Sequence, residues 1–492
     1  MQEVQPLKAQ RASSGTLNAL GFGAIAIGVK NHVFGGWLLV YYNQVLGLDP
    51  ARAGLALALA LVVDAITDPL VGVWSDRAHT RWGRRHPFMY AGIIPFAVSF
   101  YALLQPPADL SQNGLFFRLL LLTVAVRVSM TFYEIPRGAL GPELTKDYDQ
   151  RTQMVGWGTA YGWFGGAGFA WIILAFLLPE TAEYQGSRAY LNPEGYRHMA
   201  WIGGLVIFVT SMISTVSLHR HIPNLHVPEI DPSAKFSVQK LGREIIETLS
   251  NRSWLTLFAA GLVFALYVGL HSNTDRYYDL YFWQWVPAQV QVFPIVHMAI
   301  AISCGLLVYP LTRGRDKKRI AIGLFLLSIT LGSLPVGLRL LDPMFSVTLF
   351  PANGTDVLWW ILLLHSSFLI SLGVIGFILI GSMVADIVEE SQRATGRRSE
   401  GLLTAGPALA QKTMSAGGVF VVGMLLSAFG FSTANPTMES MQEPIRNLAT
   451  FHVALNLTLP WISIYLVSKY TITRSGHAQD IKNLGYAESQ NA

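Results

Sequence analysis

The sequence predicts an all-α membrane protein with twelve transmembrane helices in two bundles of six. Only 13% of the 492 residues are charged and 52% are hydrophobic, whereas soluble domains carry about 25% charged residues. The mean hydropathy is +0.40. A membrane-spanning helix needs about 20 apolar residues, and the chain contains twelve such stretches. With their short loops they fill nearly the whole chain, which leaves no room for a large soluble domain.

One long polar segment divides these stretches into six and six. The stretches are centred near residues 32, 62, 96, 125, 165, 208, 268, 298, 330, 372, 416 and 459. The polar segment begins with a proline-containing linker and then has helical apolar spacing, at Val238, Leu241, Ile245 and Leu249, typical of a helix lying on a membrane surface. We therefore expect a bundle at 1–218, a cytoplasmic linker with an amphipathic helix at 219–253, and a second bundle with a cytoplasmic tail at 254–492.

Basic residues gather in the loops of one side, which predicts the orientation of the chain. The rich segments are 77–85, 235–252, 313–319 and 393–398. By the positive-inside rule this side is cytoplasmic, and both termini lie there. The net charge of +5 is therefore no signal for nucleic-acid binding. We expect a multi-pass protein of a bacterial-type inner membrane that contacts the lipid bilayer and functions as a monomer.

The loops at 76–85 and 312–319 repeat each other in the two halves of the chain. Both are short, basic and glycine-containing, and both follow the second apolar stretch of their half. Such a six-plus-six repeat is typical of a transporter that rocks two bundles around a central site.

Two carboxylates, Asp64 and Asp68, lie four residues apart in the second apolar stretch, where an ionised Asp costs about 2.5–3.5 kcal/mol. They share one helix face, and Pro69 leaves the carbonyl of Ala65 without its helical donor. These oxygens favour a site for Na⁺, Li⁺ or a proton. The alternative is that both carboxylates form salt bridges to a neighbouring helix.

The fourth stretch repeats this pattern with Arg127, Thr131 and Glu134, which share one face of a helix. Thr131 offers a hydroxyl oxygen and Glu134 a carboxylate, and Pro136 frees the carbonyl of Phe132. Arg127 is a bidentate donor suited to sugar hydroxyls or a carboxylate. The alternative is an internal Arg127–Glu134 ion pair without a ligand role.

Further polar residues in the apolar stretches are candidates for the substrate site. Lys30 and Asn31 lie midway along the first stretch, where the lysine is too far from an end to reach the interface. Lys412 in the eleventh stretch is a candidate for the second wall of a cavity. The glycine run at 165–168 lacks the strand and lysine of a phosphate loop and favours close helix packing. No enzyme constellation is evident, and we expect a protein without catalytic activity or bound cofactor.

The motifs resemble the glycoside–pentoside–hexuronide:cation symporters, the melibiose-permease branch of the major facilitator superfamily, over nearly the whole chain. The resemblance rests on residues 64–72 with 81–88, on Tyr133-Glu-Ile-Pro136, on residues 143–151, and on residues 383–390 with 395–401, and it ends near Lys412. It implies the major facilitator fold and uptake of a sugar or glycoside driven by Na⁺, Li⁺ or H⁺.

The resemblance also implies roles for single residues. Asp64, Asp68 and Thr131 match the cation ligands, and would hold Na⁺ if sodium is the coupling ion, with Glu134 nearby. Glu134 also matches an acidic sugar contact, Phe377 a sugar-contacting aromatic, and Lys412 a lysine that links the halves. The predicted substrate-binding set is Lys30, Asn31, Arg127, Glu134, Phe377 and Lys412.

The chain departs from the family pattern at three places. Asn31 stands where an early Lys-Asp pair has its carboxylate, Gly138 replaces an aromatic, and residues 152–179 contain no basic side chain. We therefore hypothesise that Arg127 supplies the cationic sugar contact.

The expected activity is secondary active symport by alternating access. A charge latch is expected to hold the outward-facing state, formed by Asp76, Arg81, Arg84, Arg85, Asp386, Glu389 and Glu390. Two alternatives remain, a cation-coupled carrier of lysolipids or other amphiphiles, and an integral-membrane transferase.

Overall fold

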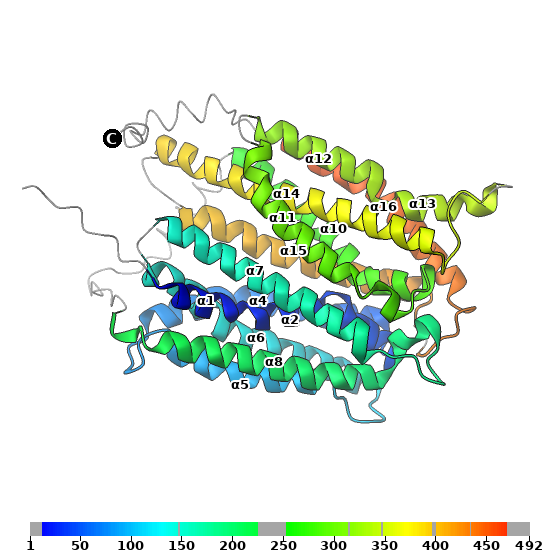
Figure 1. The fold of residues 1–492 in the computed structure, drawn as a ribbon, viewed down its shortest axis with the longest axis horizontal. Coiled ribbons are helices and arrows are strands. Elements are labelled where there is room, and N and C mark those ends of the chain that lie inside the picture. Colours follow the sequence, from blue (N-terminus) through cyan, green and yellow to red (C-terminus); the bar gives the residue numbers. More distant parts are fainter. Residues whose placement is uncertain are drawn as a thin grey trace, which may run out of the picture. The chain divides into compact units, whose positions relative to one another are not determined.

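The computed structural model describes residues 12–145, 148–224, 252–312, 315–345, 348–395, 400–432 and 434–469. The expected amphipathic linker helix at 236–249 lies outside these residues. A helix occupies each of the twelve predicted positions (Figure 1). The predicted all-helical architecture is confirmed, and no strand occurs in the described residues.

The first half of the chain contains six spans. The first is built from five short pieces, α1 (Ser14–Phe22), α2 (Ala24–His32), η1 (Val33–Trp37), α3 (Leu38–Val40) and η2 (Tyr41–Val45). The other five are α4 (Pro50–Arg77), α5 (His86–Leu103), α6 (Gln112–Leu144), α7 (Tyr148–Ile172) with η3 (Ile173–Leu177), and α8 (Pro193–His219). Short η4 (Gly186–Leu191) and η5 (Ile222–Asn224) lie in loops.

The second half follows with α10 (Arg252–Tyr277), η6 (Tyr278–Phe282), η7 (Pro287–Val290), α11 (Phe293–Thr312), α12 (Lys317–Gly332), α13 (Leu334–Leu341), η8 (Asp342–Met344), α14 (Asp356–Thr395), α15 (Glu400–Ala428) and α16 (Gln442–Ser468). Ten helices of the described chain are long and apolar enough to cross a membrane. α10 and α15 contribute the shorter apolar segments Trp254–Val263 and Met414–Ala428.

The chain forms two compact units. The first comprises Met1–Glu229, Ser272–Met298 and Val422–Met438, and the second comprises Ile230–His271, Ala299–Val421 and Glu439–Ala492. The first unit therefore includes the ends of α10 and α15 as well as the first six spans. The predicted boundaries at 218 and 254 stay a prediction.

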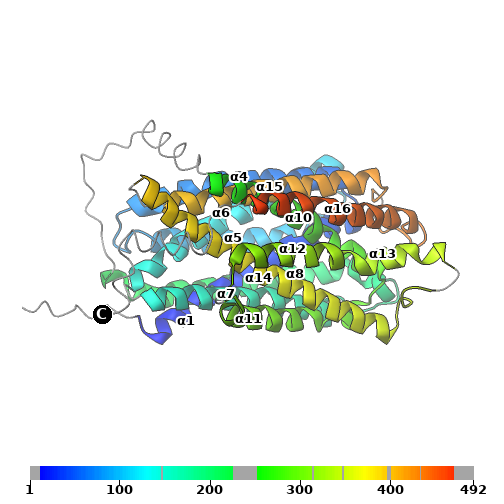
Figure 2. The same cartoon turned by 90° about the horizontal axis from the view of Figure 1, so that it is seen from above.

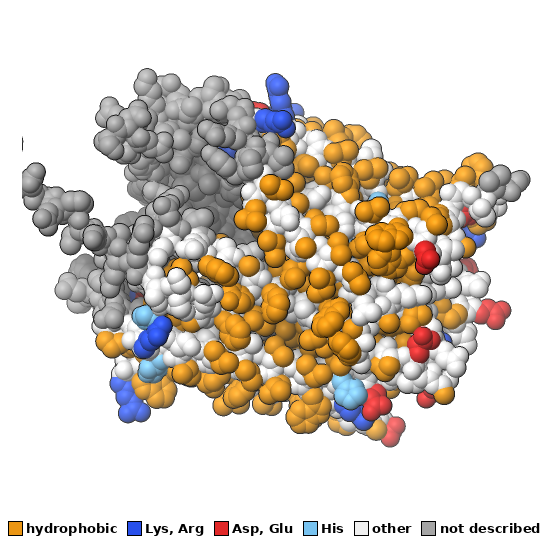
Figure 3. All heavy atoms as spheres, in the orientation of Figure 1, with side chains coloured by type: hydrophobic (Ala, Val, Ile, Leu, Met, Phe, Trp, Pro, Cys, Tyr) orange, Lys and Arg blue, Asp and Glu red, His pale blue; other side chains and the backbone are white. Residues whose placement is uncertain are grey.

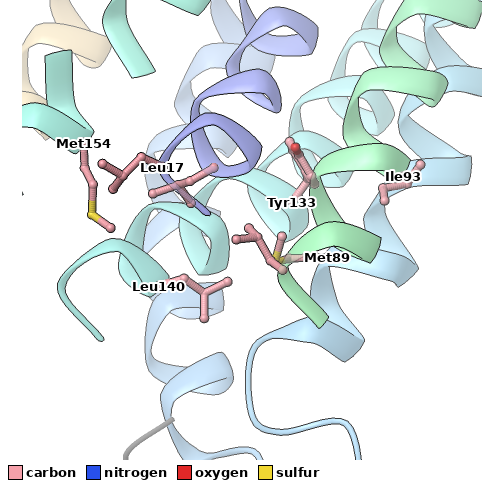
Figure 4. Close-up of a cluster of buried hydrophobic side chains, with 8 residues drawn as sticks. Leu17, Met89, Ile93, Tyr133, Leu140 and Met154 are labelled. Atoms are coloured by element: carbon pink, nitrogen blue, oxygen red, sulfur yellow. The ribbon is translucent and has the colours of Figure 1, made fainter. Parts of the chain in front are cut away.

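Within the first unit α4 packs on α6, and α5 packs on both α6 and α8. Figure 2 shows the helices from above, turned by 90° from the view of Figure 1. One buried cluster joins α1, α5, α6, α7 and α8, and consists of Leu17, Leu20, Met89, Ile93, Tyr133, Leu140, Met154 and Leu218 (Figure 4). In the second unit α12 packs on α14 and α16. Its cluster consists of Trp254, Leu257, Ala260, Ala321, Met383 and Val467.

The outer faces of the helices are apolar. On α4, Val62, Ile66 and Leu70 are 41%, 58% and 62% exposed, whereas Asp64 between them is 1% exposed. Hydrophobic side chains are spread over the described surface visible in Figure 3, and charged side chains are few there. An apolar face toward lipid and a polar residue toward protein are what a spanning helix requires, so α4 presents its carboxylates to the bundle interior.

The first span is interrupted where two glycines follow each other. Gly35 has φ −86° and ψ 68°, and Gly36 has φ 104°, so the helical hydrogen bonding breaks here. The left-handed conformation of Gly36 suits glycine because it lacks a Cβ, and a Cβ on Gly36 would lie 2.8 Å from the carbonyl oxygen of Ser272. In membrane proteins such breaks are tolerated where they are buried or line a cavity.

Candidate cation and substrate site

The two aspartates of α4 converge on one hydroxyl of α6. Thr131 Oγ1 lies 2.8 Å from Asp68 Oδ1, 3.3 Å from Asp64 Oδ1 and 3.1 Å from the carbonyl oxygen of Arg127. A threonine hydroxyl has one proton, so it can donate to only one of these three oxygens at a time. Three oxygens, two of them from carboxylates, therefore surround the hydroxyl of Thr131.

Arg127 forms an ion pair with one of these carboxylates. Its Nη1 donates to Asp64 Oδ2 over 3.1 Å. The side chains of Arg127 and Asp64 are 10% and 1% exposed, so the pair is largely removed from water. The salt bridge to a neighbouring helix, which the sequence left open as the alternative for the aspartates, is thus present for Asp64. It uses the opposite oxygen of the carboxylate from the one near Thr131.

A single aromatic ring lies beside two cationic side chains. The ring centroid of Phe34 is 5.4 Å from the guanidinium carbon of Arg127 and 5.1 Å from Lys30 Nζ. A desolvated cation over an aromatic face gains about 2 kcal/mol. Phe34 belongs to η1, directly before the glycine break, so the interrupted first span brings its ring to α6.

The remaining predicted site residues of this unit lie close by along their helices. Lys30 is buried, and its Nζ donates to Asn31 Oδ1 over 3.1 Å. Asn31 is exposed and Glu134 is half-buried. Glu134 follows Thr131 by three residues on α6, where helical periodicity turns it to the same side.

Phe377 and Lys412, the two substrate candidates of the second half, belong to the second unit. Phe377 lies on α14 with 66% of its surface exposed, and Lys412 lies on α15 and is half-buried. Their substrate-binding roles stay predictions.

The basic loop after α4 forms an ion cluster with α6. Arg85 Nη2 lies 2.5 Å from Glu143 Oε1 and 3.1 Å from Asp76 Oδ1, and Arg84 also pairs with Glu143. Burial lowers the pKa of Arg85, and the two carboxylates oppose that shift. Glu143 thereby ties the loop to the end of α6.

The other predicted latch residues, Arg81 and the three acids of α14, are not part of this ion cluster as the structure describes it. Arg81 is exposed, and its guanidinium stacks over the Trp82 ring at 5.4 Å. Asp386, Glu389 and Glu390 fall within α14, but their side chains lie outside what the structure describes. The latch across the two halves stays a prediction.

A second polar cluster, which we call the amide cluster, closes the opposite end of the first unit. Asn43 and Gln44 in η2 are both 0% exposed. Asn43 Nδ2 donates to the carbonyl of Phe431 over 2.8 Å, and Asn43 Oδ1 accepts from the Tyr277 hydroxyl over 2.8 Å. Gln44 accepts from the Tyr281 hydroxyl and donates to the same Phe431 carbonyl. The two amides thus bind the ends of α10 and α15 to the first span.

Aromatic packing surrounds this cluster. Trp37 is 0% exposed, stacks on Tyr190 with centroids 5.8 Å apart, and lies 5.2 Å from the guanidinium of Arg276. Arg276 in turn pairs with Asp279 over 2.6 Å. Burial raises the pKa of Asp279, which follows α10 in η6, to about 6. Apolar rings and a compensated charge keep water away from the amides.

Sequence reasoning did not single out Phe34, Glu143, Asn43 or Gln44 as site or gate residues. Phe34 lies four residues after Lys30, which places it on the same helical face, and this spacing is a signal that could have identified it. Asn43 and Gln44 are adjacent amides within an apolar span, which is also unusual enough to notice. Nothing local marks Glu143 as the partner of the arginines.

No three His, Cys, Asp or Glu side chains of the described residues converge as a multivalent metal would need. The site contains two carboxylates with neutral oxygens instead.

The chain is similar in sequence and in fold to known transport proteins. The family profile described as "MFS/sugar transport protein" matches residues 19–473. An uncharacterized symporter of Synechocystis sp. is 25% identical over 99% of both chains, and the isoprimeverose transporter of Lactiplantibacillus pentosus is 25% identical over 80% of this chain and 76% of its own. Among solved structures, the xylose transporter XylE from E. coli has a TM-score of 0.57 at 13% identity, covering 94% and 97% of the two chains.

Proposed function

Since the chain belongs to the MFS/sugar transport family, and within it to the glycoside–pentoside–hexuronide:cation symporters, we propose that Asp64, Asp68 and Thr131 bind its coupling ion. The chain is a multi-pass bacterial membrane protein that couples sugar or glycoside transport to a cation. The observation that carries the site assignment is the hydroxyl of Thr131 within 3.3 Å of both carboxylates. The family favours this function over an amphiphile carrier or a transferase.

The chemistry of the site supports a monovalent ion, Na⁺, Li⁺ or H⁺. Two carboxylates that share one hydroxyl repel each other in a poorly solvated interior. A cation between them removes this repulsion and replaces its own lost water with protein oxygens. Glu134, one turn along α6, lies at the edge of this set and adds a third carboxylate toward the substrate.

The substrate is proposed to lie beside the cation. Lys30, Asn31, Arg127 and Glu134 provide donors and acceptors of the kind that bind sugar hydroxyls. Phe377 and Lys412 are proposed to contribute from the second half. The two sets of side chains meet at Glu134, so we expect binding of one ligand to raise the affinity for the other, and by linkage the factor is the same in both directions.

Transport then follows from alternating access. A loaded site carries less net charge than an empty one, so the two bundles can rock past each other around it. We propose that the cluster of Arg84, Arg85, Asp76 and Glu143 acts at the cytoplasmic side, together with Arg81 and with Asp386, Glu389 and Glu390. The amide cluster then lies at the outer side.

The orientation and assembly follow the same reasoning. The basic loops place both termini in the cytoplasm. The protein is proposed to work as a monomer, because one chain already contains both halves of the repeat. It is proposed to have no catalytic activity and no cofactor.

The test is gradient-driven uptake by purified protein in proteoliposomes. Inward gradients of Na⁺, Li⁺ or H⁺ are applied with a panel of radiolabelled glycosides that includes isoprimeverose and lactose. Asp68→Asn keeps the size of the side chain and removes one carboxylate charge. We expect it to abolish the stimulation by the gradient while the protein elutes as the wild type does in size exclusion.

Asp109→Asn is the matched control. Asp109 is exposed in the loop before α6 and has φ 60°, a conformation that asparagine also accepts. This variant removes the same charge far from the site along the chain and should keep its coupling. Full cation stimulation in Asp68→Asn would reject the assignment of the site.

A further inference from the structure

We propose that the guanidinium of Arg127 is a tethered cation that occupies Asp64 in the ion-free protein, and that the coupling ion displaces it toward the substrate. This inference rests on the proposed function. It adds that the guanidinium of Arg127 competes with the coupling ion for the carboxylate of Asp64. It is carried by the ion pair of Arg127 with Asp64, by the burial of both side chains, and by the position of Phe34.

The first step is the division of the Asp64 carboxylate. Its Oδ2 accepts from Arg127 Nη1 over 3.1 Å, whereas its Oδ1 lies 3.3 Å from the Thr131 hydroxyl. One oxygen of this carboxylate thus binds Arg127, and the other belongs to the proposed cation site of Asp64, Asp68 and Thr131. The carboxylate carries a single negative charge, which the guanidinium already balances, so the charge of Asp68 alone remains for a cation bound at Asp64, Asp68 and Thr131.

The second step is the cost of having both cations present. Asp64 and Arg127 are 1% and 10% exposed in their side chains, so water screens little of the repulsion between a bound ion and the guanidinium. Two positive charges a short distance apart in a poorly solvated interior repel each other strongly. The state with both cations on Asp64 is therefore disfavoured, and binding of the ion drives Arg127 off.

The third step is the path that Arg127 can take. Its backbone lies in the middle of α6, where the hydroxyl of Thr131 donates to the Arg127 carbonyl over 3.1 Å. In the paired position the guanidinium lies 5.4 Å from the Phe34 ring, which helps to hold it there. The arginine side chain is long enough to leave Asp64 without movement of its backbone. The released donor would face the side where Asn31 is exposed and Lys30 lies near the same ring.

This arrangement gives a physical reason for coupling. With Arg127 on Asp64, its Nη1 donates to the carboxylate, which also balances its charge, so the guanidinium contributes less to substrate binding. With the ion bound, this donor and this charge become available to the substrate. The apparent affinity for the ion is lowered by the fraction of protein in which Arg127 occupies Asp64, and substrate that binds the released guanidinium reverses part of that loss.

The experiment is isothermal titration of purified protein in lipid nanodiscs with NaCl and LiCl, without substrate and at constant ionic strength. Arg127→Gln removes the competing charge, and we expect its half-saturating Na⁺ or Li⁺ concentration to fall about tenfold. Arg127→Lys keeps a tethered cation and should remain near the wild-type value. Arg52→Gln removes an exposed positive charge elsewhere and should also leave binding unchanged.

Phe34→Leu provides a second variant, which keeps the ion pair and removes the ring that holds it. It should tighten ion binding in the same direction as Arg127→Gln, about threefold. If Arg127→Gln fails to fold, this variant and Arg127→Lys still decide the proposal. Each variant is accepted only if it elutes as a single peak in size exclusion.

Unchanged or weaker ion binding in Arg127→Gln or Phe34→Leu would overturn the proposal. Ion binding seen only in Arg127→Gln, and never in the wild type, would overturn the displacement step. Gradient-driven uptake by the wild type in the same lipids tests the proposed function separately. If that uptake persists while Arg127→Gln binds ions as the wild type does, the tethered cation is wrong and the symport stands.

Discussion

At the scale of single residues, the hydroxyl of Thr131 connects α4 and α6. It lies within 3.3 Å of both aspartates, so its oxygen is a ligand in the proposed cation site of Asp64, Asp68 and Thr131. Thr131→Ala removes this oxygen and leaves a small void. We expect the cation to bind about tenfold more weakly, as the loss of about 1.4 kcal/mol would give, measured by titration calorimetry with Na⁺ or Li⁺.

Two variants control for this prediction. Thr131→Ser keeps the hydroxyl and should bind the cation nearly as the wild type does. Thr123→Ala removes a buried hydroxyl that has no hydrogen-bond partner and lies two turns earlier on α6. A similar loss of affinity in Thr123→Ala and Thr131→Ala would show a general effect on α6 instead of a lost ligand.

The sequence identified the members of this site more reliably than their pairing. Spacing along α4 and α6 predicted that Asp64, Asp68 and Thr131 face one side of their helices, because helical periodicity is a local property. It could not decide whether Arg127 pairs with Glu134 or with an aspartate. The Arg127–Asp64 contact depends on the rotation and depth at which α6 packs on α4, which no single helix determines.

At the scale of elements, glycines allow α2 and α7 to cross with their backbones in contact. A Cβ on Gly165 would lie 2.4 Å from the carbonyl oxygen of Ile25, and one on Gly28 would lie 2.1 Å from the carbonyl oxygen of Gly162. The packing that the glycine run predicted is thus present, and small residues permit it as in other membrane helix pairs. This crossing sets the position of Lys30 on α2.

We predict that Gly165→Ala destabilises the protein by about 1–3 kcal/mol, the usual cost of overpacking. Gly168→Ala is the matched control on the same helix, because no atom lies within 4 Å of the Cβ it would add. Thermal unfolding in detergent should show a lower midpoint for Gly165→Ala than for the wild type. Gly168→Ala should keep the wild-type midpoint. Equal midpoints for the two variants would contradict the close crossing.

The elements themselves could be predicted from the sequence, apart from their interruptions. Apolar length predicted a helix at all twelve positions, because lipid forces backbone groups to be satisfied within each span. The break at Gly35 and Gly36 was not predicted, since glycine pairs also occur in unbroken membrane helices. The carbonyl of Ser272 beside Gly36 belongs to a distant part of the sequence, so only the packing shows why a glycine is needed.

At the scale of the whole molecule, we predict that the amide cluster is a gate that opens for access from the outer side. Tyr277→Phe removes the hydroxyl that donates to Asn43 Oδ1 over 2.8 Å. The loss of one buried hydrogen bond, about 1 kcal/mol, should raise the outward-open population about fivefold. Tyr101→Phe is the control, because the described contact of Tyr101 is its ring packing on Trp201 at 4.5 Å.

Because the chain has a single cysteine, one substitution gives a background without thiols for site-specific labelling. Cys304→Ser removes the native thiol, and Gly35→Cys adds a reporter at an exposed position where no atom lies within 4 Å of its Cβ. A membrane-impermeant maleimide is applied to right-side-out vesicles. Faster labelling with Tyr277→Phe is expected, and labelling at the rate of the Tyr101→Phe control would refute a gate at the amide cluster.

The sequence by itself determined the fold class, the likeness to a family of cation-coupled sugar symporters, and the two helix faces that carry Asp64, Asp68 and Thr131. These properties follow from apolar length, charge distribution and helical periodicity, all of which are local. Only the tertiary structure decided that Arg127 occupies Asp64, that Phe34 lies beside Arg127 and Lys30, and that Asn43 binds the end of α10. Each of these contacts joins residues on different helices, and the side-chain packing between helices, which is not local in sequence, fixes which polar groups meet.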